Sequence, residues 1–161
     1  MNTAENQIDL FDKTSREDLI IQQAIKILES RATYHVEKQT VSCPDDMKKL
    51  ARLRLANLEH EVFLAVFLDN RHQVIATDEL FRGTVDGAAV YPREVVKEAL
   101  RRNAAAVVFA HNHPSGNSEP STADGNITKK LVEALNLVDV RVLDHIVVGD
   151  DCTSMAELGI I

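Results

Sequence analysis

Three short apolar segments constrain the fold of this chain more than any other feature of its sequence. They cover residues 61–69, 104–110 and 140–148 and consist mainly of aliphatic residues and phenylalanine. Segments of this length are typical of buried β-strands, and none approaches the roughly 20 residues that a membrane span needs. Residues 70–72 have the composition of a turn, so we expect residues 73–81 to pair with the first strand as a hairpin.

Helical periodicity precedes the first strand. Residues 16–32 place their apolar side chains on one stripe, after a Ser15–Asp18 spacing that is typical of a capping box. A second helix is predicted to begin at residues 44–46 and to continue to residue 58. Its apolar positions at helical spacing are Met47, Leu50, Leu53 and then Ala56 or Asn57.

The second half of the chain alternates between helix and strand. Pro92 suits the first turn of a helix, and Ser121 is a candidate N-cap for another helix that ends near Leu137. Short additional strands are predicted at residues 88–91 and near residues 154–155. This order of elements predicts an α/β domain, in which a central mixed sheet is flanked by helices.

Charge and composition exclude several classes of protein. The formal net charge of -7 argues against direct binding of nucleic acid, and we interpret the basic clusters at 48–54 and 101–102 as solvated helix faces. The N-terminus lacks the pattern of a secretory signal, so we expect a cytoplasmic protein. Cys43 and Cys152 lie too far apart for a CxxC motif, and we expect both to be reduced thiols.

The most informative stretch covers residues 104–124, AAAVVFAHNHPSGNSEPSTAD. Residues i and i+2 of a strand point to the same face, so His111 and His113 can converge on one ion where the strand ends. A proline then ends the strand, and Ser121 as N-cap places Asp124 in the first turn of the next helix. That turn can fold back toward the two imidazoles.

Each half of this pattern also has a simpler interpretation. Paired histidines at a strand end are often hydrogen-bonded surface residues, and S-x-x-D alone is a capping box. The complete pattern H-x-H-x7-S-x2-D at a strand–loop–helix junction instead favours a single zinc ion, with His111, His113 and Asp124 as ligands. Two histidines and one carboxylate leave a fourth tetrahedral position for water, which is typical of a catalytic zinc site.

These motifs resemble the JAB/MPN superfamily of zinc metalloproteases, of the JAMM-motif kind, and specifically its RadC-like branch. The resemblance is carried by HNHPSG at 111–116, PSTAD at 120–124, YPREVVKEAL at 91–100 and LDHIVVG at 143–149. It extends from about Pro44 to the C-terminus, which predicts a metal-binding domain at 44–161 after an N-terminal arm and helix at 1–43. It implies a cytidine-deaminase-like/MPN fold with an extra N-terminal helix.

The resemblance also implies roles for individual residues. It makes His111, His113 and Asp124 the zinc ligands, Ser121 the residue that stabilises the oxyanion, and an upstream glutamate the general acid/base. Glu61, at the start of the first strand, fits that glutamate best, whereas Glu59 precedes the strand and should face solvent. Glu61 could alternatively pair with an arginine such as Arg52 or Arg54.

Further titratable residues accompany the predicted strands. Asp144 and His145 point to opposite faces of the last long strand, so both cannot enter the site directly. One of them could bond to a ligand imidazole, or both could have a purely structural role in the sheet. We expect the remaining histidines not to be metal ligands; they are His35, His60 and His72.

Two functions from different classes are compatible with the sequence. The first is zinc-dependent hydrolysis of peptide or isopeptide bonds in a protein or peptide substrate. The alternative is a non-catalytic binding module of the MPN fold in assemblies for DNA repair or replication, although such scaffolds usually lack the ligands. The resemblance links the RadC-like branch to DNA repair, but the first 44 residues do not predict the helix-hairpin-helix segment of longer members. The N-terminal helix could cap the core or pair with a second copy as a homodimer.

Overall fold

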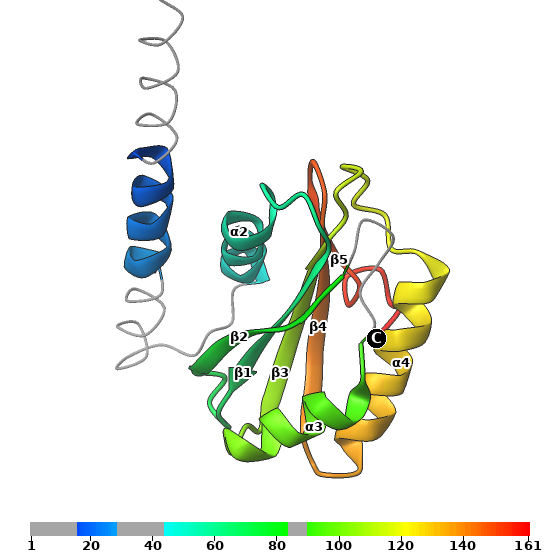
Figure 1. Cartoon of the computed structure of the whole chain (residues 1–161). Helices are drawn as coiled ribbons and strands as arrows, with labels where there is room; N and C mark the ends of the chain where they lie inside the picture. Colours follow the sequence, from blue (N-terminus) through cyan, green and yellow to red (C-terminus); the bar gives the residue numbers. More distant parts are fainter. Residues whose placement is uncertain (1–15, 29–43, 84–89) are drawn as a thin grey trace, which may run out of the picture.

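The computed structural model describes residues 16–28, 44–83 and 90–161, and one five-stranded sheet forms the centre of the domain at residues 44–161 (Figure 1). The strand order is β2-β1-β3-β4-β5. β3 and β4 are parallel, whereas all other neighbours are antiparallel. The strands are β1 (Val62–Leu68), β2 (Val74–Arg82), β3 (Ala106–Asn112), β4 (Arg141–Val148) and β5 (Cys152–Ser154). The sheet is therefore mixed, as the sequence predicts.

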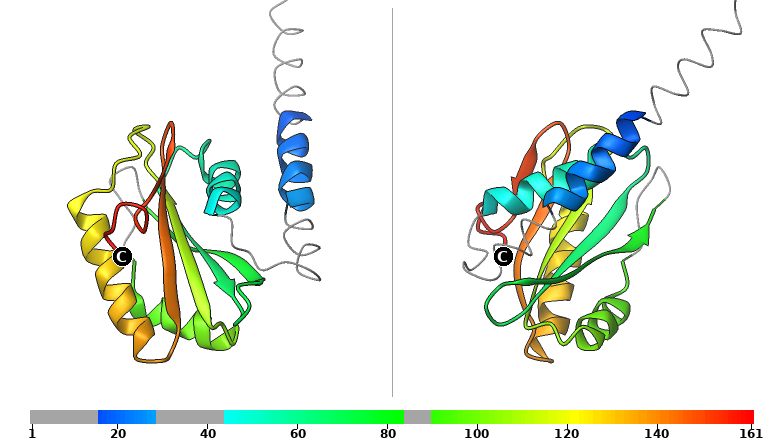
Figure 2. Two further views of the ribbon diagram at one scale, coloured as in Figure 1. Left: turned by 180° about the vertical axis from the view of Figure 1, so that it is seen from behind. Right: turned by 90° about the vertical axis from the view of Figure 1, so that its left-hand side faces the viewer.

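Helices cover both faces of this sheet (Figure 2). α2 (Pro44–Leu55) packs on one face, while α3 (Pro92–Arg101) and α4 (Thr122–Asn136) pack on the other. Residues 16–28 form a further helix, and the rest of the predicted 16–32 segment lies outside the described residues. The mixed α/β prediction is confirmed.

The two strands at the centre of the sheet are buried along their whole length. Every residue of β1 and β3 is buried, because each strand has neighbours on both sides and helices on both faces. This explains the continuous apolar runs in the sequence. β3 extends beyond its predicted end at residue 110, so that His111 and Asn112 also belong to the strand.

The predicted buried face of α2 is partly wrong. Met47, Ala51 and Leu55 face the sheet at the i, i+4, i+8 spacing of one helical stripe. Leu53 falls off this stripe and is 36% exposed. The helix also ends at Leu55, three residues before the predicted end at residue 58.

The predicted short strand at 88–91 is not found in its described part. Residues 90 and 91 are not in a strand, and residues 88 and 89 lie outside the described ranges. The strand predicted near residues 154–155 corresponds to β5, which pairs with the end of β4.

A β-bulge in β4 changes which side chains face which helices. Val107 pairs with Val142, but the next residue of β3, Val108, pairs with Asp144, so Leu143 is the extra residue. A strand without this insertion would turn Asp144 toward α4. With it, Asp144 lies on the α2 face, and the following residue, His145, lies on the α4 face.

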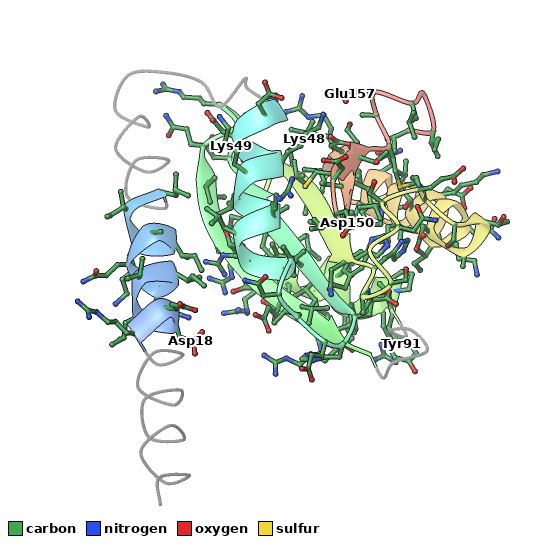
Figure 3. The ribbon with its side chains drawn as sticks, turned by 90° about the horizontal axis from the view of Figure 1, so that it is seen from above. Asp18, Lys48, Lys49, Tyr91, Asp150 and Glu157 are labelled. Carbon is green, nitrogen blue, oxygen red and sulfur yellow. The ribbon has the colours of Figure 1, made fainter. Side chains whose placement is uncertain are left out.

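The basic clusters of the sequence are neutralised by neighbouring carboxylates. Figure 3 shows Lys48 beside Glu157, and their charged atoms are 2.7 Å apart. Further pairs join Lys49 to Asp46, Arg52 to Asp151, Arg101 to Glu98 and Arg102 to Asp78. These pairs agree with the interpretation of both clusters as solvated helix faces. Within the described ranges, no helix has both the length and the apolar character to cross a membrane.

Candidate metal centre

The two histidines of the H-x-H motif converge at the end of β3. His111 is the penultimate residue of the strand and is almost fully buried, between Phe63 of β1 and Val147 of β4. His113 follows the strand, but its amide still donates to the carbonyl of Val148, 2.8 Å away, so its backbone is fixed. The i, i+2 spacing brings the two Nε2 atoms within 3.0 Å of each other.

Asp124 reaches the same point from the first turn of α4. Its Oδ1 lies 3.2 Å from His111 Nε2, and its Oδ2 lies 3.3 Å from His113 Nε2. Four tetrahedral ligands at the zinc distances of 2.0–2.1 Å are separated by about 3.3 Å, which is close to all three spacings. Among the described residues, these three alone form a group of histidine, cysteine or carboxylate side chains that could hold a metal ion.

A hydrogen bond to the backbone shows which ring nitrogen of His113 carries a proton. Nδ1 lies 2.7 Å from the carbonyl oxygen of Asn117, which can only accept a hydrogen bond. Nδ1 therefore carries the proton and donates it to Asn117. In the neutral ring, Nε2 is left with a lone pair that points at Asp124.

The proton on His111 is located by a chain of hydrogen bonds that begins at a backbone carbonyl. Thr128 Oγ1 lies 2.6 Å from the carbonyl oxygen of Asp124, so the hydroxyl donates its single proton there. Its oxygen then accepts from His145 Nδ1, 2.6 Å away. His145 Nε2 consequently accepts from His111 Nδ1 at 2.8 Å, which leaves His111 Nε2 with a lone pair.

The centre is thus built to hold a positive charge. Two imidazole lone pairs and a carboxylate face one another across about 3 Å, an arrangement that requires a cation or a proton between them. Burial opposes ionisation of Asp124, yet the neighbouring His111 and His113 and the hydroxyl of Ser121 hold the pKa of its carboxyl far below its ordinary value. The bond to Asp124, with help from Asn117 and Glu61, raises the pKa of His113. A metal ion would compete with a proton for the lone pair of His113 Nε2, which faces the Asp124 carboxylate.

Apolar surroundings keep the third histidine neutral. His145 is fully buried and meets Phe63 edge-on, with ring centroids 5.3 Å apart, and Phe109 at 6.0 Å. This burial, followed by repulsion from His111, lowers the pKa of His145 well below its ordinary value. A neutral His145 can donate through one nitrogen and accept through the other, as the hydrogen-bond chain requires.

Ser121 and Asp124 form the capping box and the metal centre together, so the two interpretations of S-x-x-D are not exclusive. Ser121 Oγ accepts from the Asp124 amide at 3.1 Å, and it donates to Asp124 Oδ2 at 2.6 Å. The Ser121 amide donates to the same oxygen at 2.7 Å. Ser121 is exposed at the mouth of the site, and its hydroxyl proton is directed at the carboxylate.

Glu61 stands directly before β1, two residues before Phe63, which pairs with His111. Its negative charge is the last and smallest of the causes that raise the pKa of His113. Arg52, one of its predicted alternative partners, instead faces Asp151 at 3.7 Å. Glu59 is exposed.

Of the two candidates for a bond to a ligand imidazole, His145 makes this bond, whereas Asp144 does not. Its Oδ2 accepts from Ser154 Oγ at 2.7 Å, and its Oδ1 accepts from the amides of His145 and Ala156. The bulge at Leu143 turns it away from the histidines, so that His145 alone of this pair reaches a ligand. His72 bonds to Arg141 in a surface position, and His35 lies outside the described residues.

Sequence reasoning missed two polar side chains around this centre, one that bonds to His145 and one that bonds to the backbone before β1. Thr128 lies one helical turn after Asp124, where any core-facing residue of α4 would lie, so no local pattern marks it. Asn112 stands between the two ligands, and its side chain points to the other face of β3. The H-N-H spacing draws attention to the histidines and gives no sign of what the middle residue contacts.

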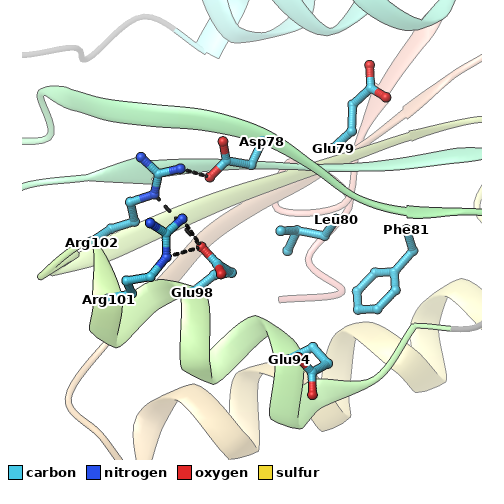
Figure 4. A pocket seen from close by; sticks show the side chains of 8 residues that line it. All are labelled: Asp78, Glu79, Leu80, Phe81, Glu94, Glu98, Arg101 and Arg102. Atoms are coloured by element: carbon cyan, nitrogen blue, oxygen red, sulfur yellow. Dashed lines mark hydrogen bonds and ion pairs between the residues drawn. The ribbon is translucent and has the colours of Figure 1, made fainter.

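The hollow between β2 and α3 is a separate feature (Figure 4). It has a volume of about 410 Å³ and contains no residue of the metal centre. Its two arginines pair with its own carboxylates, Arg102 with Asp78 and Arg101 with Glu98, both at 2.6 Å. We therefore consider the group of His111, His113 and Asp124, and not this hollow, to be the candidate functional site.

A mixed sheet with two histidines at a strand end and an aspartate in the next helical turn defines a domain of the JAB/MPN class. The sequence matches the RadC-like JAB domain family over residues 41–160. The chain therefore belongs to this family, which confirms the resemblance; JAB domains include metalloisopeptidases.

Relatives of two lengths match the chain. It is 53% identical over 150 residues to a UPF0758 protein of Vibrio cholerae, covering 93% of each protein. It is 61% identical over 118 residues to a UPF0758 protein of Marinobacter nauticus, covering 73% of this chain but 53% of that protein. A UPF0758 protein of Thioalkalivibrio sulfidiphilus is 58% identical over 121 residues, 75% of this chain and 54% of that protein. The chain thus spans about half the length of the longer relatives.

Proposed function

We propose that this protein is a zinc-dependent hydrolase of peptide or isopeptide bonds. The observation that carries the proposal is the convergence of the Nε2 atoms of His111 and His113 and the carboxylate of Asp124 on one point. Two imidazoles and one carboxylate are typical of catalytic zinc sites, in which a ligand position is left for water. A zinc ion held by His111, His113 and Asp124 would supply the Lewis acidity that makes water a nucleophile near neutral pH.

The residues around the ligands can perform the remaining steps. Glu61 can take a proton from the attacking water and later pass it to the leaving amine. Ser121, exposed at the mouth, can turn its hydroxyl proton from Asp124 toward the oxygen that develops negative charge. His145 and Thr128 hold the ring of His111 in the tautomer that binds metal.

A protein or peptide is the substrate class that this chemistry fits, and any link to DNA repair would act through a protein partner. The net charge of -7 and the paired basic side chains both oppose direct binding to DNA. A mobility assay at low salt should therefore show no shift of duplex DNA.

Hydrolysis is tested by comparing two glutamates that are two residues apart. Zinc-loaded wild type, Glu61→Gln and Glu59→Gln are incubated with a quenched peptide library and with a quenched isopeptide, in which a glycine-terminated peptide is attached to lysine Nζ. We expect Glu61→Gln to keep its zinc and to lose about 10²- to 10⁴-fold in kcat, and Glu59→Gln to match the wild type. Zinc-loaded wild type that cleaves neither probe would favour the non-catalytic binding module instead.

A further inference from the structure

Asn112, the middle residue of the H-N-H motif, makes hydrogen bonds to the segment that precedes β1. It is buried, with 2% of its surface exposed. Its Oδ1 accepts from the amide of Val62 at 2.8 Å, and its Nδ2 donates to the carbonyls of His60 at 3.0 Å and Leu58 at 3.3 Å. One side chain on β3 therefore bonds to backbone groups on both sides of Glu61.

These contacts require an amide side chain. The Val62 amide can only donate, so it needs an oxygen, whereas the carbonyls of Leu58 and His60 can only accept, so they need an N–H group. Aspartate would supply the oxygen but not the donor, and serine is too short to span both groups. The carbonyl of Glu61 itself accepts from the Gly83 amide at 2.8 Å, so the backbone on both sides of the glutamate side chain is fixed.

We propose that Asn112 is the positioning residue that holds the Glu61 carboxylate beside the metal centre. This assignment rests on the proposed function, in which Glu61 handles the proton. Alternation along β3 gives the motif two tasks: the outer histidines face the metal, while the asparagine points to the opposite face and holds the start of β1. The three consecutive residues 111–113 then fix the distance between the Glu61 carboxylate and the metal. This distance matters for catalysis, because a displacement of about 1 Å can cost 10²-fold in rate.

The test is a double-mutant cycle between Asn112 and Glu61 in the zinc-loaded protein. Asn112→Ser, Glu61→Gln and the double variant are assayed on the quenched isopeptide, and Asn70→Ser in the exposed turn after β1 is the matched control. We expect Asn112→Ser to keep its zinc and to lose about 10²-fold in kcat with KM nearly unchanged, and we expect the double variant to lose no more than Glu61→Gln alone. Amide exchange should quicken at Val62 but not across β3 and β4.

The outcomes separate this assignment from the proposed function. Full kcat in Asn112→Ser, with Glu61→Gln inactive, overturns the assignment alone. Loss of zinc from Asn112→Ser also overturns it, because the residue would then act on the ligands. An inactive zinc-loaded wild type overturns the proposed function and this assignment with it. If Asn112→Ser does not fold, Asn112→Asp is used, which keeps the acceptor for Val62 and lacks the donor for His60; we expect the same loss in kcat.

Discussion

Asp144 and His145 are buried neighbours on β4 that serve opposite faces of the sheet. On the α2 face, Asp144 accepts from the hydroxyl of Ser154 and from the backbone amides of His145 and Ala156. On the α4 face, His145 joins Thr128 to the ligand His111. The first buried polar group holds the fold together, and the second extends the metal centre. Burial of a polar residue therefore does not reveal its role; the partners on its own face do.

The largest effect should follow from removing the polar group on the α2 face. Asp144→Ala leaves buried donors without an acceptor, and we expect the free energy of unfolding to fall by about 3 kcal/mol. Urea denaturation of the metal-free protein measures this, and a zinc titration should show unchanged affinity. A loss of zinc affinity would contradict the claim that Asp144 stabilises the fold without acting on the metal centre.

A smaller effect, confined to metal binding, should follow from breaking the hydrogen-bond chain on the α4 face. Thr128→Val keeps the shape but removes the hydroxyl, so His145 can move its proton to Nε2 and force His111 into the wrong tautomer. We expect zinc affinity to fall about 10- to 100-fold, the range for such outer partners of metal ligands. Thr128→Ser retains the hydroxyl and should bind zinc like the wild type; equal losses in both variants would contradict the mechanism.

Zinc affinity should also depend on pH through His113. Its pKa is raised above 6.5, so in the metal-free protein it keeps a proton at Nε2 that the metal must displace. Asp124 stays ionised over this range, because its pKa is lowered. Affinity should therefore rise by about tenfold per pH unit up to the raised pKa of His113 and level off above it. Competition titrations from pH 5 to 8 measure the slope, and a flat profile would contradict proton competition.

The smallest effect is expected on the outer side of α2. Leu53→Ala removes a side chain that is 36% exposed and should change the free energy of unfolding by less than about 0.5 kcal/mol. Leu55→Ala, in the buried stripe of the same helix, should cost about 3 kcal/mol. Thermal denaturation of the two variants shows whether the corrected face of α2 is right.

Local patterns explain why so much of the site was predictable. The i, i+2 pair His111 and His113 needs only a strand, and the S-x-x-D cap needs only a helix start, so both follow from short-range geometry. The apolar runs likewise predict the buried strands. Leu53 was misplaced because helical spacing alone allows more than one stripe, and the sheet selects among them.

Contacts between distant segments explain what the sequence could not supply. An inserted residue at 143 decides whether Asp144 or His145 faces the ligands, and the alternation of a regular strand gives the wrong answer. Thr128 reaches His145 across 17 positions of sequence, and Asn112 reaches Val62 across 50. Such partners are fixed only when the sheet register and the packing of α4 are known.

The central claim, a metal centre at His111, His113 and Asp124, is tested most directly by metal content. Mass spectrometry is applied to the wild type, His113→Ala and His72→Ala, all purified without chelator and then supplied with zinc. The account predicts about one zinc per chain in the wild type and in His72→Ala, whose ring bonds to Arg141 at the surface, and none in His113→Ala. Wild type that holds no zinc after resupply, or His113→Ala that keeps it, would contradict the account.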